Sequence, residues 1–370
     1  ANNVGYYAIS SDCSQYITQQ ARNTLGKWRN EVKHDADSFL TNAHLQIAEQ
    51  MFGKGYFRGA NFQLERVYAR LNDWAMRRLH TIDPVNGDTT IERSLVTAHR
   101  SAIPSPIPLG VLALGDLNQM AERDQALCNW IGIHIFARWH QYRNYYWHIR
   151  SEKAPFDLTI WQAMLREIDN AIADLHQYMP QSETVARFCL FRVEFMLLPC
   201  EFLPSTQWQT YVVGAERYMQ DAKKATHDAL GTKLVERGDL KFLYELTDMW
   251  LRQWTVHEEF KSFKALTPTQ QRWFQNRLHG IAGRAQHMLD DVRGDSDYVH
   301  VEGRCYLQLV YLLLLSMELD PTALPAVQNA LHQQIQRLIT TAQEIFISRR
   351  GASFYVRVRE IGRLRSKYHL

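Results

Sequence analysis

The sequence predicts an all-α protein, a large antiparallel bundle of about ten helices. Apolar residues recur at alternating gaps of three and four positions over much of the 370-residue chain, which is the spacing that places them on one face of a helix. Glycine and proline are scarce, with 18 and 11 residues, although the many turns of an all-β chain require both. Only one short segment, near the C-terminus, alternates apolar and polar residues as a half-buried strand does.

The N-terminal apolar stripe is the longest in the chain. It runs from Ile17 to Met51, and a helix over these residues spans roughly 50 Å at 1.5 Å per residue. A helix of this length is typical of bundles with coiled-coil-like packing. We therefore expect the first part of the chain to contribute one long rod.

Three later stripes are the clearest. They lie between Trp161 and Met179, between Phe274 and Val292, and between Val327 and Ile345. The second stripe also carries a start signal, because Thr267 and Gln270 have the spacing of a capping box. Further helices are predicted at about 61–82, 116–150, 182–198, 205–230, 239–264 and 298–318.

A proline-rich segment at Ile103–Gly110 (IPSPIPLG) interrupts the helical pattern. Three prolines in five residues favour an extended backbone and exclude a helix. We expect a boundary here, so that the chain consists of an N-terminal long-helix subdomain (1–102), a main helical bundle (111–348) and a short basic tail (349–370).

The C-terminal segment concentrates positive charge. The whole chain carries +3, but residues 349–370 contain seven basic residues and one acidic residue, a net +6, which leaves −3 for the rest. Such a segment attracts nucleic acid or an acidic partner, and it is equally consistent with a solvated tail or one folded back onto the body. The candidate binding residues are Arg349, Arg350, Arg357, Arg359, Arg363, Arg365 and Lys367.

The secondary structure of this tail is left open by its pattern. Phe354, Val356 and Val358 alternate with polar or charged neighbours as in a strand, but no partner strand is evident elsewhere in the chain. The tail is therefore either helical or paired with another copy.

Five widely spaced cysteines without a CxxC pair predict reduced thiols in a cytoplasmic protein. The N-terminus shows no basic start followed by an apolar run, and the leading Ala1 is compatible with removal of either an initiator methionine or a signal sequence. The longest apolar run, Leu309–Leu315, is far shorter than the roughly 20 residues of a spanning helix. We expect a soluble protein without a membrane span.

The sharpest chemical motif is Arg143-Asn144-Tyr145-Tyr146-Trp147-His148. An arginine stabilises phosphate charge and a histidine transfers protons, as cleavage of a phosphodiester requires. The spacing resembles the Rx4H motif of HEPN-type ribonucleases, all-helical proteins in which two copies meet in a dimer. The resemblance implies metal-independent RNA cleavage with Arg143, Asn144 and His148 as the catalytic residues.

The same helix also has a purely structural interpretation. Arg143 and His148 would lie at the margins of a buried aromatic stripe, and His140, Asn144 and His148 would form a solvated polar stripe. The aromatic residues of this helix point in too many directions for one stripe, so they form either a binding surface or a helix buried on all sides. No haem attachment motif is present, and we expect no cofactor and no bound metal.

An acidic cluster at 290–297 loosely resembles the magnesium-binding motif of helical isoprenoid synthases. Its third aspartate, Asp295, comes one position later than in DDxxD. Those enzymes need a second acidic cluster facing the first, which the sequence does not supply. An ordinary acidic loop is expected here.

Two functions remain from these observations. The first is an interaction or assembly protein that presents aromatic helical surface to a protein partner or a second copy. The alternative is the HEPN-like ribonuclease, whose basic tail would guide RNA.

Overall fold

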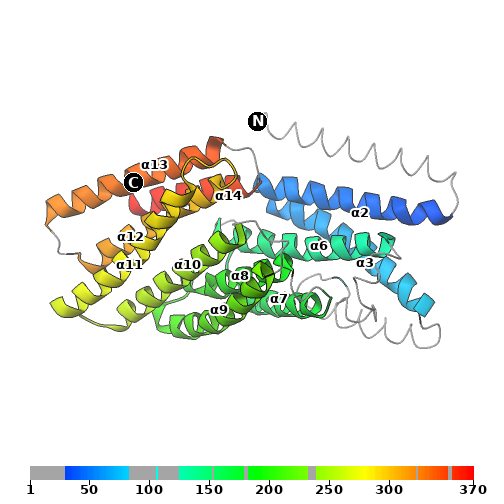
Figure 1. The fold of residues 1–370 in the computed structure, drawn as a ribbon, viewed down its shortest axis with the longest axis horizontal. Helices are drawn as coiled ribbons and strands as arrows, with labels where there is room; N and C mark the ends of the chain where they lie inside the picture. Colours follow the sequence, from blue (N-terminus) through cyan, green and yellow to red (C-terminus); the bar gives the residue numbers. More distant parts are fainter. Residues whose placement is uncertain are drawn as a thin grey trace. The chain divides into compact units, whose positions relative to one another are not determined.

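The computed structural model describes residues 30–82, 106, 125–151, 154–178, 182–231, 239–321, 324–348 and 352–370. Eleven α-helices and two short 3₁₀ turns make up the described elements, and the described residues contain no strand (Figure 1). The all-α prediction is therefore confirmed. Contacts divide the chain into two compact units, which we call unit 1 (Ala1–His148 and Gln162–Tyr178) and unit 2 (Ile149–Trp161 and Met179–Leu370). Of the expected boundary segment, only Pro106 lies within the described residues.

Unit 1 contains α2 (Asn30–Gly53), α3 (Phe57–Ile82) and most of α6 (Gln125–Arg150) and α7 (Leu158–Tyr178). Helix α2 is the described end of the long N-terminal stripe, and the earlier part of that stripe lies outside the described residues. The short turn between α2 and α3 requires Gly55, whose φ is +72°, a value that residues with a side chain rarely adopt.

Polar and aromatic contacts connect α3, α6 and α7 within unit 1. The rings of Trp74 and Trp130 stack with their centroids 5.4 Å apart. The Tyr68 hydroxyl donates to Gln141 Oε1 at 2.8 Å. The buried Arg138 guanidinium donates to Asp174 Oδ2 at 2.6 Å, so α6 and α7 share a buried ion pair.

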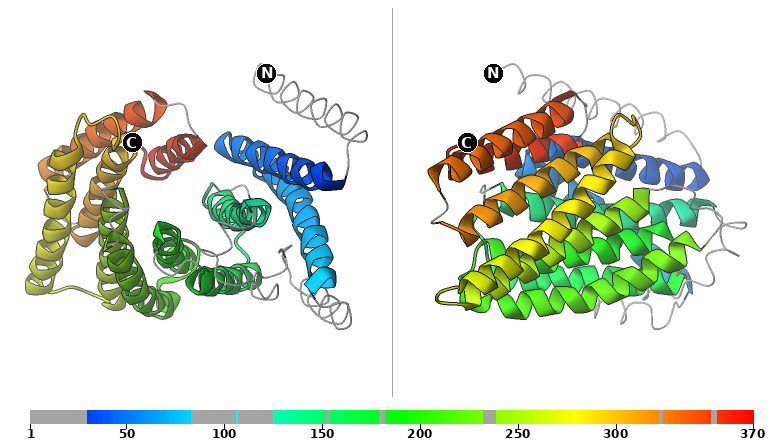
Figure 2. Two further views of the ribbon diagram at one scale, coloured as in Figure 1. Left: turned by 45° about the vertical axis from the view of Figure 1, so that its right-hand side comes forward. Right: turned by 60° about the vertical axis from the view of Figure 1, so that its left-hand side comes forward.

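Unit 2 is a bundle of seven further helices. Consecutive helices pack against each other, and α10 contacts α8, α9, α11 and α12. Figure 2 shows α11, α12 and α13 lying side by side. The helices are α8 (Glu183–Leu197), α9 (Trp208–Leu230), α10 (Asp239–Ser262), α11 (Pro268–Val292), α12 (Val299–Leu319), α13 (Pro325–Ser348) and α14 (Ala352–Tyr368), and the 3₁₀ turns are η2 (Leu198–Glu201) and η3 (Ser205–Gln207).

The start of α11 follows the sequence signal closely. Thr267 is the N-cap, and the reciprocal bonds of the capping box with Gln270 are both present. The predicted helix at 205–230 is nearly right, but its first turn is the separate 3₁₀ segment η3. Pro204 precedes that segment as its N-cap residue.

The C-terminal segment is helical, so the strand alternative is wrong. In α14 the residues Val356, Ile361 and Leu364 are 3%, 1% and 3% exposed. Their spacing fits one face of a helix, and this face is buried, whereas a strand would turn Val356 and Ile361 to opposite sides. The burial of this face therefore decides in favour of the helix over the strand.

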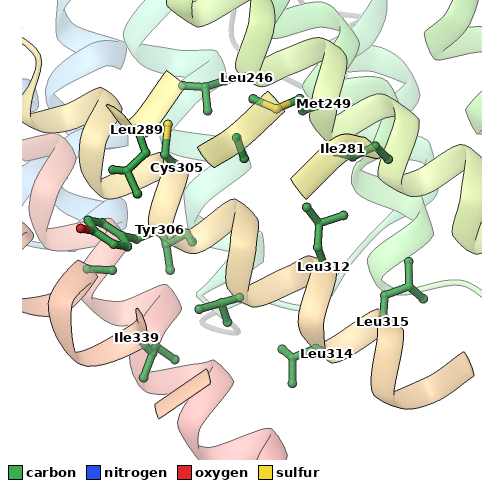
Figure 3. Packing of buried hydrophobic residues seen from close by; sticks show 14 of the residues in the cluster. Leu246, Met249, Ile281, Leu289, Cys305, Tyr306, Leu312, Leu314, Leu315 and Ile339 are labelled. Atoms are coloured by element: carbon green, nitrogen blue, oxygen red, sulfur yellow. The ribbon is translucent and has the colours of Figure 1, made fainter. Parts of the chain in front are cut away.

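The core of unit 2 is formed by side chains of α10, α11, α12, α13 and α14. Figure 3 shows Met249, Ile281, Cys305 and Ile339 converging from four of these helices. Cys305 is fully buried, and burial raises its pKa to about 12. It is therefore a packing residue and not a reactive thiol.

Helices α12 and α13 approach each other closely at Gly303. A Cβ atom at this position would lie 2.6 Å from Cζ of Phe346.

We expect Gly303→Ala to destabilise unit 2 by about 1–3 kcal/mol through overpacking, as measured by urea unfolding followed by tryptophan fluorescence. Gly280→Ala in α11 is the control, because a Cβ there meets nothing within 4 Å, and it should stabilise by about 0.5–1 kcal/mol. Equal effects of the two substitutions on the free energy of unfolding would contradict the close approach of α12 and α13. Adding Phe346→Leu to Gly303→Ala should restore part of the lost stability.

Candidate functional site

The predicted catalytic residues of α6 all have partners in unit 1. Asn144 is fully buried, and its Nδ2 donates to the carbonyl oxygen of Phe57 at 3.0 Å and to Asn61 Oδ1 at 2.5 Å. The Arg143 guanidinium lies over the Phe52 ring at 5.0 Å. The His148 ring stacks on the Phe57 ring with centroids 5.2 Å apart. These contacts connect α6 to the α2–α3 hairpin.

The expected solvated face on α6 is wrong. His140 is 8% exposed and Asn144 is 0% exposed. Burial lowers the pKa of His140 to about 4, and the charge of Arg143 contributes to the same shift. His140 is therefore neutral near pH 7. Tyr142 and Tyr146 on this helix are also buried, whereas Phe136 on the same helix is 59% exposed.

Two further arginine–histidine pairs in the chain have the same spacing as Arg143 and His148. In the first, Arg29 lies outside the described residues, and the side chain of His34 is not described. In the second, Arg252 lies on α10 in unit 2 and pairs with Asp248 at 2.7 Å, while His257 on the same helix lines a cavity described below.

Two of the basic C-terminal residues, Arg363 and Arg365, bond to groups outside α14. Arg363 donates to Glu201 Oε2 at 3.0 Å and to the carbonyl oxygen of Arg150 at 2.9 Å. Arg357 pairs with Glu360 at 2.7 Å, and Arg365 donates to Thr340 Oγ1 at 3.1 Å. Arg349 and Arg350 lie outside the described residues.

A buried ion network lies beneath α14. Arg150 Nη2 is 2.9 Å from Glu360 Oε1, and Arg150 Nε is 2.9 Å from Glu201 Oε1. The Tyr311 hydroxyl donates to Glu360 Oε1 at 2.7 Å. Although burial alone would raise the pKa of the Glu360 carboxyl, the charges of Arg150 and Arg357 hold it well below its usual range. Glu360 is therefore a permanently charged anchor at neutral pH.

A cavity of about 380 Å³ lies beside this network in unit 2. This volume falls within the range of roughly 300–1,000 Å³ found for small-molecule pockets. Its walls come from the end of α6, η2 and the following turn, the start of α9, and α10, α12 and α14. The lining includes the aromatic residues Phe202, Trp208, Trp250, Trp254, His257, Tyr311 and Tyr368.

Charged groups are grouped at one side of this cavity. Glu318 Oε2 lies 2.9 Å from Lys261 Nζ and 3.4 Å from His257 Nε2. Burial alone would raise the pKa of the Glu318 carboxyl, but His257 and Lys261 lower it to about 2. Cys200 also lines the cavity, and burial raises its pKa to about 12, so it is a poor nucleophile.

The α10–α11 and α12–α13 connections lie at the same end of the unit 2 bundle (Figures 1 and 2), and exposed apolar side chains lie in or next to each of them. We call the four residues Phe263, Trp273, Leu324 and Val327 the turn-end patch. They are 43%, 50%, 71% and 48% exposed. The rings of Phe263 and Trp273 both pack against the buried ring of Phe274.

Neither the cavity nor the patch was predicted from the sequence. Trp250 on α10 faces Tyr311 on α12, and only this contact between distant helices makes it a cavity wall. The exposure of Trp273 could have been predicted from the sequence. It lies one position before the buried Phe274 and therefore about 100° around the helix from the apolar stripe. A large aromatic residue off the stripe predicts an exposed ring.

No protein-family model, no curated protein and no solved structure matches this chain. In the described part of the chain, no helix has both the length and the apolar character needed to cross a bilayer. Among these same residues, no group of three or more His, Cys, Asp or Glu side chains is placed to hold a metal ion. The aspartates at 290–297 are used locally, since Asp295 Oδ1 accepts from the backbone of Asp297 and Asp290 accepts from Gln286.

The buried network makes a prediction for α14. Glu360→Gln leaves Arg150 and Arg357 without their shared anion, which should cost about 3–5 kcal/mol and increase amide hydrogen exchange over 352–368. Because the folded pKa of Glu360 is lowered, its contribution is present above the unfolded value near 4.5 and is lost as the pH falls below it. Glu360→Gln should therefore also reduce the acid sensitivity of α14. The control is Glu344→Gln on the exposed side of α13, and an equal effect of the two variants would contradict the network's role.

Proposed function

We propose that this chain is a helical interaction protein that presents aromatic surface to a protein partner and carries out no catalysis. The observation that carries this proposal is the turn-end patch. Trp273 and Phe263 are held in place by Phe274 and still expose about half of their surface. Burying a side chain of this size contributes roughly 1.5–3 kcal/mol. Preformed exposed rings of this kind favour partner binding.

The charge around the patch favours a partner with acidic groups. The Arg277 guanidinium lies over the Trp273 ring at 4.6 Å and is ion-paired with Glu259. Lys264 and Arg272 are exposed on either side of the turn. Tryptophan and arginine are the residue types most enriched at the energetic centres of interfaces. An apolar recess with an acidic rim on the partner is the complementary surface.

Nucleic acid is a less favoured partner. Several of the basic residues expected to meet phosphates already bond within the chain, namely Arg357, Arg363 and Arg365. Tight binding to nucleic acid requires many cations to contact phosphates at once. The internal bonds of α14 reduce that number.

The patch proposal predicts the effect of a double substitution, Phe263→Ser with Trp273→Ser. We expect partner affinity to fall by at least about 30-fold, because centres of interfaces contribute 2 kcal/mol or more. Cross-linking in the native extract would identify the bound protein, and titration of that purified protein would give the dissociation constant.

The matched control is Phe39→Ser, which removes an exposed ring from unit 1. Sedimentation velocity of the purified chain tests whether the partner is a second copy, since self-association would then be lost in the double variant. Retention of the same cross-links and affinity in the double variant would reject the patch as the contact surface.

The ribonuclease alternative has its own test. We expect no cleavage of labelled RNA in EDTA, because Arg143, Asn144 and His148 are engaged with partners inside unit 1. The comparison uses His148→Ala and, as a control, His279→Ala at an exposed position of α11. Cleavage that persists in EDTA, survives His279→Ala and disappears in His148→Ala would establish the enzyme instead.

A further inference from the structure

The tryptophan rings in the wall of the unit 2 cavity are covered by other side chains. The His257 ring stacks on the Trp254 ring with centroids 5.5 Å apart, and the Arg150 guanidinium lies over the Trp250 ring at 5.8 Å. The indoles are therefore walls of the cavity and not platforms on which a guest stacks. Recognition of a ligand here depends on the charged side chains of the lining.

The charged side chains around this cavity include more cations than carboxylates. Counting the lining residues and the ion pairs in which they take part, directly or through Glu360, the cations are Arg150, Arg357, Arg363, Lys261 and Lys367, and the carboxylates are Glu201, Glu318 and Glu360. Glu194, another carboxylate near Arg357, is paired with Arg304. Within this set, two positive charges are therefore in excess, and an excess of this sign favours an anionic ligand.

Two of these cations are neighbours on α14. Arg363 and Lys367 are four positions apart and both line the cavity, and like charges at this spacing on a helix repel each other. Arg363 donates to Glu201 and to the carbonyl oxygen of Arg150, and an arginine has further N–H groups beyond these two bonds. Lys367 is exposed and forms no ion pair among the described residues, and its ammonium group lies over the Tyr368 ring at 5.2 Å. An anion between the two side chains would remove their repulsion.

We propose that this cavity binds a small phosphate monoester, with its phosphate group held between Arg363 and Lys367. A phosphate monoester carries a charge of about −1.5 to −2 near pH 7, which matches the excess of positive charge around the cavity. Its oxygens accept charge-assisted hydrogen bonds from a guanidinium fork and from an ammonium group. The cavity volume of about 380 Å³ exceeds that of a phosphate group and leaves room for the organic part. This inference does not depend on the partner that the turn-end patch binds.

The test uses glycerol 3-phosphate as the probe, with binding to the full chain measured by isothermal titration calorimetry. Glycerol has the same organic part without the charge, and inorganic phosphate has the charge without the organic part. We expect glycerol 3-phosphate to bind with one site per chain, inorganic phosphate to bind about tenfold more weakly, and glycerol not to bind at all. The proposal is overturned if glycerol 3-phosphate does not bind, or if either comparison compound binds as tightly.

Substitutions on α14 locate the site. Lys367→Gln removes an exposed charge without disturbing the core, and it should weaken the binding of glycerol 3-phosphate about tenfold and reduce its salt dependence. Lys367→Arg keeps the charge and should keep the affinity within about twofold. Lys223→Gln removes the same charge from an exposed position of α9 that does not line the cavity, so it is the matched control and should leave the affinity unchanged. Unchanged affinity in Lys367→Gln, or an equal loss in Lys223→Gln, would place the ligand elsewhere.

Discussion

The buried ion network under α14 is the interaction on which the architecture of unit 2 near its cavity depends. Arg150 holds two carboxylates at once, Glu201 at the end of the η2 turn and Glu360 on α14. These groups are far apart in sequence, so the network closes a long stretch of chain around one guanidinium. An arginine is suited to this role because its planar fork presents several donors in fixed directions.

This network also explains why a cavity exists at this place. Each charged group of the network needs its partner. Replacing one of them by an apolar side chain would leave the other as an unpaired buried charge. Helix α14 is therefore held at the position set by Arg150 and Glu201, and the rings of Trp250 on α10 and Tyr311 on α12 meet each other edge to face. Rings fixed in this way do not fill the space between the helices completely.

The motif on α6 illustrates how a catalytic pattern and a structural one coincide. Asn144 satisfies a backbone carbonyl of α3, and Arg143 and His148 pack against aromatic rings of the hairpin. Each of these contacts joins α6 to α2 or α3. Arg143 and His148 therefore have structural roles, although their spacing matches that of a motif for phosphodiester cleavage.

The sequence by itself determined the helices, because the three–four spacing of apolar residues and local signals such as Thr267 with Gln270 act within a few residues of chain. It also narrowed the tail to a helix or a strand. Only the tertiary structure decided that α14 is a docked helix, that His140 and Asn144 are buried, and that Trp250, Trp254 and Lys367 line one cavity. These outcomes depend on contacts between distant residues, such as Arg150 and Glu360, which are 210 positions apart. No local pattern encodes which distant side chain will supply the partner.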